Sequence, residues 1–255
     1  MTEGGTIRVL EVDPELGLSV PVAEIARARQ SLLARLRVLE PGIHEIPRDE
    51  GARGYLGYLI VEGVIARDLM LAGHISTELV GEGDFLQPWL ATRDDSLLPH
   101  DVFWHILTPV KMAVLDDVFA KRLVHWPQVI AALLERSLRR THRMALHHAL
   151  LQLSPAETRL LVLFWHLAER WGRVTPEGIV LRLALTHQLL GQLIGCQRAS
   201  VTTALKEIIA SGLVVRRPDG TWLLKGAPPD ELTRVHWLRG REPHAPVRER
   251  VRLAW

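Results

Sequence analysis

The chain has 255 residues, of which 47% are hydrophobic and 24% are charged, a balance typical of packed globular proteins and unlike that of disordered ones. Its single cysteine excludes an internal disulfide, and also a zinc or iron–sulfur site built from four cysteines of one chain. The N-terminus lacks a signal-peptide pattern, and no apolar run approaches the roughly 20 residues that span a bilayer. We therefore expect a soluble cytoplasmic protein with no membrane partner.

The two halves of the chain differ in charge. Residues 1–126 contain 12 Lys and Arg against 19 Asp and Glu, and 12 − 19 gives −7. Residues 127–255 contain 19 against 10, and 19 − 10 gives +9, so the two halves sum to the net charge of +2. An acidic half and a basic half indicate two domains with different partners, the basic one suited to nucleic acid.

The first half predicts one helix followed by short strands. Residues 21–39 carry apolar side chains at helical spacing and stop before Pro41 and Gly42, which favours a helix. From residue 42 to residue 115, β-favouring runs alternate with Gly, Asp and Glu, as in an antiparallel sandwich or barrel. Residues 102–115 are expected to form its closing strands, and residues 92–101 a loop.

A short helix beginning at Asp116 or Asp117 and a long one beginning at Pro127 are predicted next. An apolar stripe on the long helix indicates core packing or a dimer seam. Its members are Val129, Ile130, Leu133, Leu134, Leu138, Ala145 and Ala149. The other face of this helix is basic. It is either a surface exposed to solvent or a surface that binds an anionic ligand or lies at an interface. Its residues are Arg136, Arg139, Arg140 and Arg143.

The fourth helix is expected to begin with a capping box, in which Ser154 is the N-cap and Glu157 its partner, and to end at Gly172. Near the C-terminus, residues 213–226 predict a β-hairpin around Pro218-Asp219-Gly220. The basic tail that follows, rich in Pro and Arg, includes one segment compatible with a short helix.

Residues 186–209 carry a helix-turn-helix pattern. Thr186 is suited to cap a short helix, Gly195 lies where the chain must turn sharply, and a second helix begins at Gln197 or Arg198. The apolar positions of the second helix follow helical spacing and are Val201, Ala204, Leu205, Ile208 and Ile209. Together with the hairpin, this pattern predicts a winged helix-turn-helix, with Cys196 packed in the turn rather than reactive.

Side chains suited to a DNA major groove are predicted on the outer face of the second helix. Arginine pairs with guanine, glutamine pairs with adenine, and hydroxyl groups reach phosphates. Because the N-terminal end of a recognition helix meets the bases, Arg198 is the first candidate for base recognition, against the alternative of a surface ion pair. The set on this helix is Gln197, Arg198, Ser200, Thr202, Thr203 and Lys206, and the wing adds Arg216, Arg217 and Lys225 as phosphate contacts.

Residues 185–224 resemble the DNA-binding motif of the Crp/Fnr family of bacterial regulators. The matching residues are Thr186, Gln188, Gly191, Gly195, Cys196, Arg198, Ser200, Val201 and Leu205. Residues 58–85 more weakly resemble the β-roll sensor domain of that family, and residues 127–152 its long dimer helix.

The resemblance implies an α+β fold. Its parts would be an N-terminal antiparallel β-roll (a jelly roll like that of cyclic-nucleotide-binding domains) with an N-terminal helix over residues 1–126, a dimerisation helix over 127–153, a winged helix-turn-helix over 154–226 and a basic tail over 227–255.

The resemblance also implies a nucleoid-associated homodimer that binds a palindromic operator in double-stranded DNA and recruits or blocks RNA polymerase. The dimer would pair through Ile130, Leu134, Leu138 and Ala145. Phosphate contact carries over to Thr186 and Gln188, with His187 between them, and guanine contact to Arg198. The family usually has charged residues at the positions of Ala199 and Thr203, so we expect a different operator sequence.

The effector is not identified by the sequence. Gly83-Asp84-Phe85 is followed by Leu86-Gln87-Pro88-Trp89. The resemblance would imply a cyclic-nucleotide pocket, whose glutamate holds the ribose and whose Arg-Ser or Arg-Thr pair neutralises the phosphate. Neither the glutamate nor the arginine pair is present here. The family's cysteine-ligated iron–sulfur sensor is excluded by the lack of cysteines. We expect no cofactor, since the histidines that could ligate a haem or metal are better explained as ordinary core or surface residues. They are His74, His100, His105, His142, His147 and His148.

Two alternatives to an effector-gated regulator stay open. In one, the β-roll is a ligand-free dimer scaffold. In the other, the chain is a metal-dependent enzyme of the cupin type, because such enzymes share the β-roll architecture. His74 and Glu78 occur without the second histidine that the cupin pattern requires, so we expect no enzyme.

Overall fold

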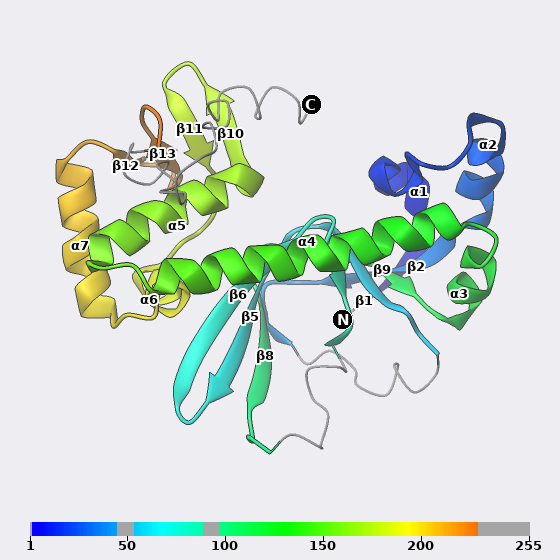
Figure 1. Ribbon diagram of the computed structural model, residues 1–255, viewed down its shortest axis with the longest axis horizontal. Coiled ribbons are helices and arrows are strands. Elements are labelled where there is room, and N and C mark those ends of the chain that lie inside the picture. The colour runs from blue at the N-terminus through cyan, green and yellow to red at the C-terminus, as the bar shows by residue number, and fades with distance from the viewer. Residues whose placement is uncertain (1, 45–53, 89–96, 229–255) are drawn as a thin grey trace, which may run out of the picture.

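The computed structural model describes residues 2–44, 54–88 and 97–228. Helix α4 (Pro127–Leu151) runs along much of the structure, with a β-sheet lobe against one side and a smaller lobe of helices and short strands at its C-terminal end (Figure 1). Of the loop expected at residues 92–101, residues 92–96 lie outside the described residues, 97–100 are irregular as predicted, and Asp101 already belongs to strand β8. Nearly all of the basic tail also lies outside the described residues. Within the described ranges, no helix is both long enough and apolar enough to cross a membrane.

The N-terminal lobe consists of two antiparallel sheets, which confirms the predicted β-roll. One sheet has the strand order β1-β2-β9-β4-β7 and the other β3-β8-β5-β6. Side chains from both sheets, among them Tyr58, Ile65 and Trp104, share one apolar core. The strands are β1 (Thr2–Arg8), β2 (Leu33–Leu39), β3 (Gly42–His44), β4 (Gly57–Glu62), β5 (Val64–Leu71), β6 (His74–Gly81), β7 (Phe85–Leu86), β8 (Asp101–Ile106) and β9 (Val110–Leu115).

The helix predicted over residues 21–39 is wrong in its second half. Helix α2 (Val22–Ser31) ends early, and β2 then pairs with β1 on one side and β9 on the other. Ala34 and Leu39 of β2 are buried, whereas Arg35 is exposed. Pairing with two neighbouring strands outweighs the local helical spacing, and β1, which no sequence pattern indicated, is the edge strand that makes this possible.

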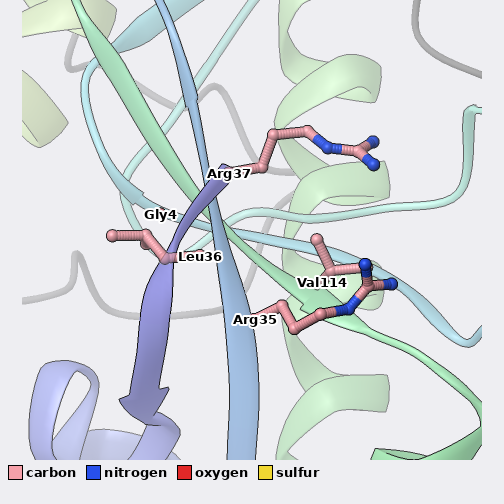
Figure 2. A pocket seen from close by; sticks show the side chains of 5 residues that line it. All are labelled: Gly4, Arg35, Leu36, Arg37 and Val114. Carbon is pink, nitrogen blue, oxygen red and sulfur yellow. The ribbon is translucent and has the colours of Figure 1, made fainter. Parts of the chain in front are cut away.

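A small crevice lies where β1, β2 and β9 run side by side. Its volume is about 20 Å³, and Gly4, Leu36 and Val114 contribute to its lining. Figure 2 shows Arg35 and Arg37 on one side of β2 and Leu36 on the other. The crevice has room for about one water molecule, so it is no effector site.

Short helices cover one end of the β-roll. They are α1 (Val9–Val12), the 3-10 helix η1 (Pro14–Gly17), α2 and α3 (Asp117–Leu123). The start of α3 is as predicted, since the Asp116 carboxylate accepts a hydrogen bond from the Phe119 amide at 2.9 Å. These helices share an apolar core with the first turns of α4, where Val129 and Leu133 are buried.

The predicted apolar stripe of α4 divides into two faces. Val129 and Leu133 pack into the N-terminal lobe, whereas Ile130, Leu134 and Leu138 are 44%, 60% and 61% exposed. Ala145 and Ala149 are also exposed. The single stripe expected from the sequence is therefore a short buried face followed by a longer face open to solvent.

The basic face of α4 is mostly engaged within the chain, so the solvated surface expected as one possibility is wrong for three of its four arginines. Arg136 bonds to Asp13 and Glu15 at 3.0 and 2.8 Å, and Arg140 makes two hydrogen bonds of 2.7 Å to Glu78. Arg143 pairs with Asp84. Arg139 alone stays at the surface, paired with Glu135 one turn away.

The C-terminal lobe is a winged helix-turn-helix, as predicted. Phe164 and Trp222 lie at its centre with ring centroids 5.0 Å apart. The hairpin around Pro218-Asp219-Gly220 is present, and β10 and β11, not foreseen from the sequence, extend it to a sheet of order β10-β11-β13-β12. The elements are α5 (Ala156–Trp171), β10 (Gly172–Thr175), β11 (Gly178–Leu181), α6 (His187–Ile194), α7 (Arg198–Ala210), β12 (Val214–Arg216) and β13 (Trp222–Leu224).

The capping box predicted at the start of α5 is wrong. The helix begins at Ala156, so the N-cap position falls on Pro155, which has no side-chain acceptor, and no side-chain capping bond forms. The end of the helix at Gly172 is as predicted.

The two lobes pack directly on each other. Helix α6 contacts β6, and Val64, Ala66 and Leu79 of the β-roll belong to the same apolar core as the helices of the C-terminal lobe. A Cβ added to Gly81 would lie 3.3 Å from the Trp171 ring, so that ring rests on the backbone of the β-roll. Apolar burial of this kind stabilises one relative placement of the lobes.

Acid should weaken the packing of α5 on α4. The ring of His166 lies 6.4 Å from that of His147, and burial, with the charges of His147 and Arg143, lowers the pKa of His166 to about 4 from its usual 6.5. The unfolded chain therefore binds a proton, below pH 6.5, that the folded chain excludes until about pH 4. From this group alone, the free energy of unfolding should fall by at most about 3 kcal/mol across that window.

Chemical denaturation of the wild type and of His166→Gln at pH 7 and at pH 4.5 measures this contribution. We expect the free energy of unfolding to depend less on pH in His166→Gln than in the wild type. The pH dependence of His125→Gln, which replaces an exposed histidine, should equal that of the wild type. Equal pH dependence in all three proteins would contradict the assignment.

Candidate nucleic-acid interface

Helices α6 and α7 form the turn expected of a DNA-binding motif. The Thr186 hydroxyl accepts a hydrogen bond from the Leu189 amide at 3.1 Å and caps α6, as predicted. Gly195 ends α6 in the left-handed conformation, with φ of 64°, and Gln197 is the N-cap residue of α7. The predicted positions of both helix starts and of the sharp turn are confirmed.

The inner face of α7 fixes its position in the lobe. Val201, Ala204, Leu205 and Ile208 are buried against the core of the lobe, as expected. Ile209, predicted to belong to the same face, is 40% exposed and lies off it.

Gly191 makes the closest backbone approach in the motif. A Cβ at this position would lie 2.6 Å from the carbonyl oxygen of Cys196, and the Cys196 amide donates to the Gly191 carbonyl at 2.9 Å. Cys196 itself is partly buried and packs against the lobe's core. Its placement in the turn agrees with a packing role.

The outer face of α7 is open to solvent. Five of the six residues predicted there are exposed, namely Gln197, Arg198, Ser200, Thr203 and Lys206. Thr186 and Gln188 at the start of α6 are exposed as well, and His187 is half-buried. The N-terminal end of α7 therefore presents Gln197 and Arg198 to any molecule that approaches the motif.

Thr202 is engaged inside the motif. Its hydroxyl donates to the Arg198 carbonyl at 3.0 Å and lies 3.0 Å from Nδ1 of His187. The pair ties α6 to α7, so Thr202 and His187 hold the two helices together. Sequence reasoning also missed Arg159, which donates to the Ile194 carbonyl at 2.9 Å and anchors the end of α6, because no local pattern marks such a contact.

The wing residues differ in their availability. Lys225 is exposed. The Arg216 guanidinium lies 5.4 Å from the centre of the Trp222 ring, and Arg217 pairs with Glu177. A phosphate would therefore compete with Glu177 for Arg217, whereas Lys225 and the exposed Arg216 have no carboxylate partner among the described residues.

A second candidate site is an open cleft of about 320 Å³ between the β-roll and α4. Arg67, Trp104, Arg140 and Met144 are among the residues that line it. Glu78 bonds to both arginines. Burial raises the pKa of Glu78, but hydrogen bonds and charges from Arg140 and Arg67 outweigh it and hold that pKa below its usual value.

The candidate metal ligands named from the sequence are not gathered at one place among the described residues. His74 and His105 are exposed, and within residues 2–44, 54–88 and 97–228 no group of three His, Cys, Asp or Glu side chains is placed to hold a metal ion. Glu78, the possible ligand in the cupin alternative, is engaged by two arginines instead.

Residues 146–225 match the family model of the Crp-like helix-turn-helix domain. The chain has a Crp-like DNA-binding domain in a Crp/Fnr-type fold. The resemblance seen in the sequence is thereby confirmed for the domain and the fold. None of the curated proteins matches the chain.

Solved structures of Crp/Fnr-type proteins share the architecture. A cyclic nucleotide-binding domain containing protein from Listeria monocytogenes superposes with a TM-score of 0.64 at 15% identity, covering 84% of this chain and 98% of that one. The global regulator CLP from Xanthomonas campestris gives 0.57 at 18%, covering 81% and 100%. A mutant of CooA from Carboxydothermus hydrogenoformans gives 0.57 at 21%, covering 76% and 84%. At these identities the likeness establishes the fold.

Two glycines of the Crp-like domain should respond differently to alanine. In Gly195→Ala, the new Cβ would contact only the end of the Leu151 side chain, at 3.6 Å. The loss of stability should therefore come from holding alanine in the left-handed conformation, which costs roughly 1–2 kcal/mol. Gly191→Ala collides with the Cys196 carbonyl and must open the turn, which we expect to cost about 3 kcal/mol or more. Denaturant unfolding of both variants measures the difference, and equal losses would contradict the close approach at Gly191.

Proposed function

We propose that this protein is a sequence-specific transcription regulator that binds a palindromic operator in double-stranded DNA as a homodimer. The observation that carries the proposal is the exposed N-terminal end of α7, in a domain whose other face is buried. Gln197 and Arg198 lie at this end, and Ser200 follows two residues further along the helix. Such a helix end suits a major groove, because its first side chains reach base edges while its amide groups favour phosphate.

Arg198 has the leading role in this proposal. A guanidinium offers two parallel donors that match O6 and N7 of guanine. Ala199 and Thr203 occupy positions where the family usually has charged residues that contact bases. Fewer charged contacts would therefore add to that of Arg198. Thr186, Gln188, Lys206, Arg216 and Lys225 would hold the phosphate backbone, and their contribution would fall as salt rises.

The exposed apolar face of α4 supports the homodimer. Ile130, Leu134 and Leu138 follow one another at four-residue spacing and stay open to solvent, although each is large and apolar. Apolar side chains repeated along one face of a long helix are typical of a helix–helix seam. Two copies joined along α4 would present their recognition helices to successive major grooves, roughly 34 Å apart.

The cleft between the β-roll and α4 is the proposed effector site. Its lining combines apolar and aromatic side chains with two arginines, a mixture suited to a small organic molecule. The Xanthomonas campestris regulator is described as responsive to c-di-GMP, which shows that a similar fold answers to a small molecule. A thermal-shift screen of metabolites separates gating from a ligand-free scaffold, because a ligand that prefers the folded state raises the melting temperature.

RNA polymerase is the expected partner at the promoter. An operator that overlaps the promoter would block the enzyme, and one upstream would recruit it. The same DNA-binding mechanism supports either outcome, and the localisation at the nucleoid follows from it.

Substitution of Arg198 tests base recognition. Arg198→Ala should weaken operator binding by about 1–3 kcal/mol while changing binding to unrelated DNA much less. The matched control is Arg29→Ala, which removes the same charge from an exposed position on α2. Fluorescence anisotropy at fixed salt measures both affinities, and an equal loss on every DNA would show that Arg198 contacts phosphate only.

Charge placed in the exposed face of α4 tests the dimer. Leu134→Lys combined with Leu138→Lys should convert the dimer to a monomer, because paired lysines would meet across the seam without partners. Val22→Lys, at a residue 92% exposed on α2, controls for the added charge. Light scattering at micromolar concentration reports the mass, and a dimeric double variant would place the interface elsewhere.

A further inference from the structure

One buried carboxylate connects three parts of the molecule. Asp84, in the turn between β6 and β7, is 2% exposed. Its Oδ2 accepts hydrogen bonds from the Gly81 amide at 2.9 Å and from Nη1 of Arg170 at 2.7 Å, and its Oδ1 accepts one from Arg143. Arg143 belongs to α4 and Arg170 to α5, so Asp84 ties the β-roll to the long helix and to the DNA-binding domain.

Arg170 is held from several sides. Its second terminal nitrogen donates to the Glu82 carbonyl at 2.7 Å, and its guanidinium lies 4.6 Å from the centre of the Trp171 ring. That ring in turn rests on Gly81. An ion pair fixed by this many contacts keeps one geometry, unlike a surface pair of long mobile side chains.

The docking of the two lobes leaves the DNA-binding face open. The contact between the lobes is made by α6 with β6 and by Trp171 with Gly81, whereas Arg198, Ser200 and Lys206 are exposed. The Asp84 contacts therefore do not act by covering the recognition helix. They lie instead where the β-roll, α4 and α5 meet.

We propose that Asp84 is a positioning residue for DNA recognition: through Arg143 and Arg170 it sets the orientation of the DNA-binding domain on α4, and thereby the separation of the two recognition helices in the dimer. This rests on the proposed function, since separation matters only when two half-sites are bound together. Loss of the Asp84 charge would leave two guanidinium groups at the joint without their carboxylate, and the domain would sample other orientations.

The test compares paired and single half-sites. The DNA is a palindromic duplex that the wild-type protein selects from a random-sequence pool, together with a duplex that carries one half-site. Asp84→Asn can still accept the Gly81 hydrogen bond but no longer neutralises the arginines. We expect its affinity for the palindrome to fall about tenfold, the usual size of a coupling between sites, while its affinity for the single half-site stays within about a factor of two.

A second readout is the spacing between half-sites. When one or two base pairs are inserted at the centre of the palindrome, the wild type should lose more affinity than Asp84→Asn, because the variant tolerates other separations. The matched control is Glu82→Gln, which removes the same charge from an exposed side chain two residues away. It should behave as the wild type in every assay.

Arg170→Gln breaks the same contact from the side of the DNA-binding domain and serves as the test should Asp84→Asn fail to fold. The loss for the two changes combined should be smaller than the sum of the two separate losses, because both remove the contact between Asp84 and Arg170. Equal losses on palindrome and half-site, or wild-type behaviour of both single variants, would overturn the proposal. A wild-type protein that selects no paired half-sites would instead refute the proposed homodimer function.

Discussion

The ion pairs between α4 and the β-roll are the interaction on which the rest of the structure depends. Arg136, Arg140 and Arg143 follow one another three or four residues apart, so they share one face of the helix and reach carboxylates on separate segments of the N-terminal lobe. Turning this face inward leaves the face of Leu134 and Leu138 outward. The same contacts thus position the β-roll and expose the surface that a second copy would cover.

The charge difference between the two halves of the chain partly reflects ion pairs within the molecule. Part of the excess of the basic half is neutralised by the acidic half of the same chain, through pairs such as Arg140 with Glu78 and Arg170 with Asp84. Among the described residues, positive groups on the exposed side of the helix-turn-helix and the wing, such as Arg198, Lys206 and Lys225, remain available to phosphates. A basic half therefore indicates a nucleic-acid partner less directly than its net charge suggests, and the recognition motif carries most of the argument.

Local signals in the sequence predicted what local physics determines. Thr186 caps α6, Gly195 adopts a left-handed turn, and Asp116 caps α3, each decided by residues within a few positions. Features that depend on distant partners were missed. Residues 33–39 form β2 because β1 and β9 flank them, and Arg143 is paired because folding brings Asp84, 59 residues earlier, beside it. Local patterns can also mislead. The capping pattern is present at Ser154, but the helix begins two residues later, at Ala156.

In the proposed mode of action, two copies of this Crp-like domain bind DNA together and are held at a fixed separation by α4 and the β-roll. Hydroxyl-radical footprinting of the wild-type protein on genomic fragments that it binds is the decisive measurement. We expect two protected segments of related, inverted sequence, with centres about 10–10.5 base pairs apart. One protected segment without symmetry, or two at variable separation, would contradict it.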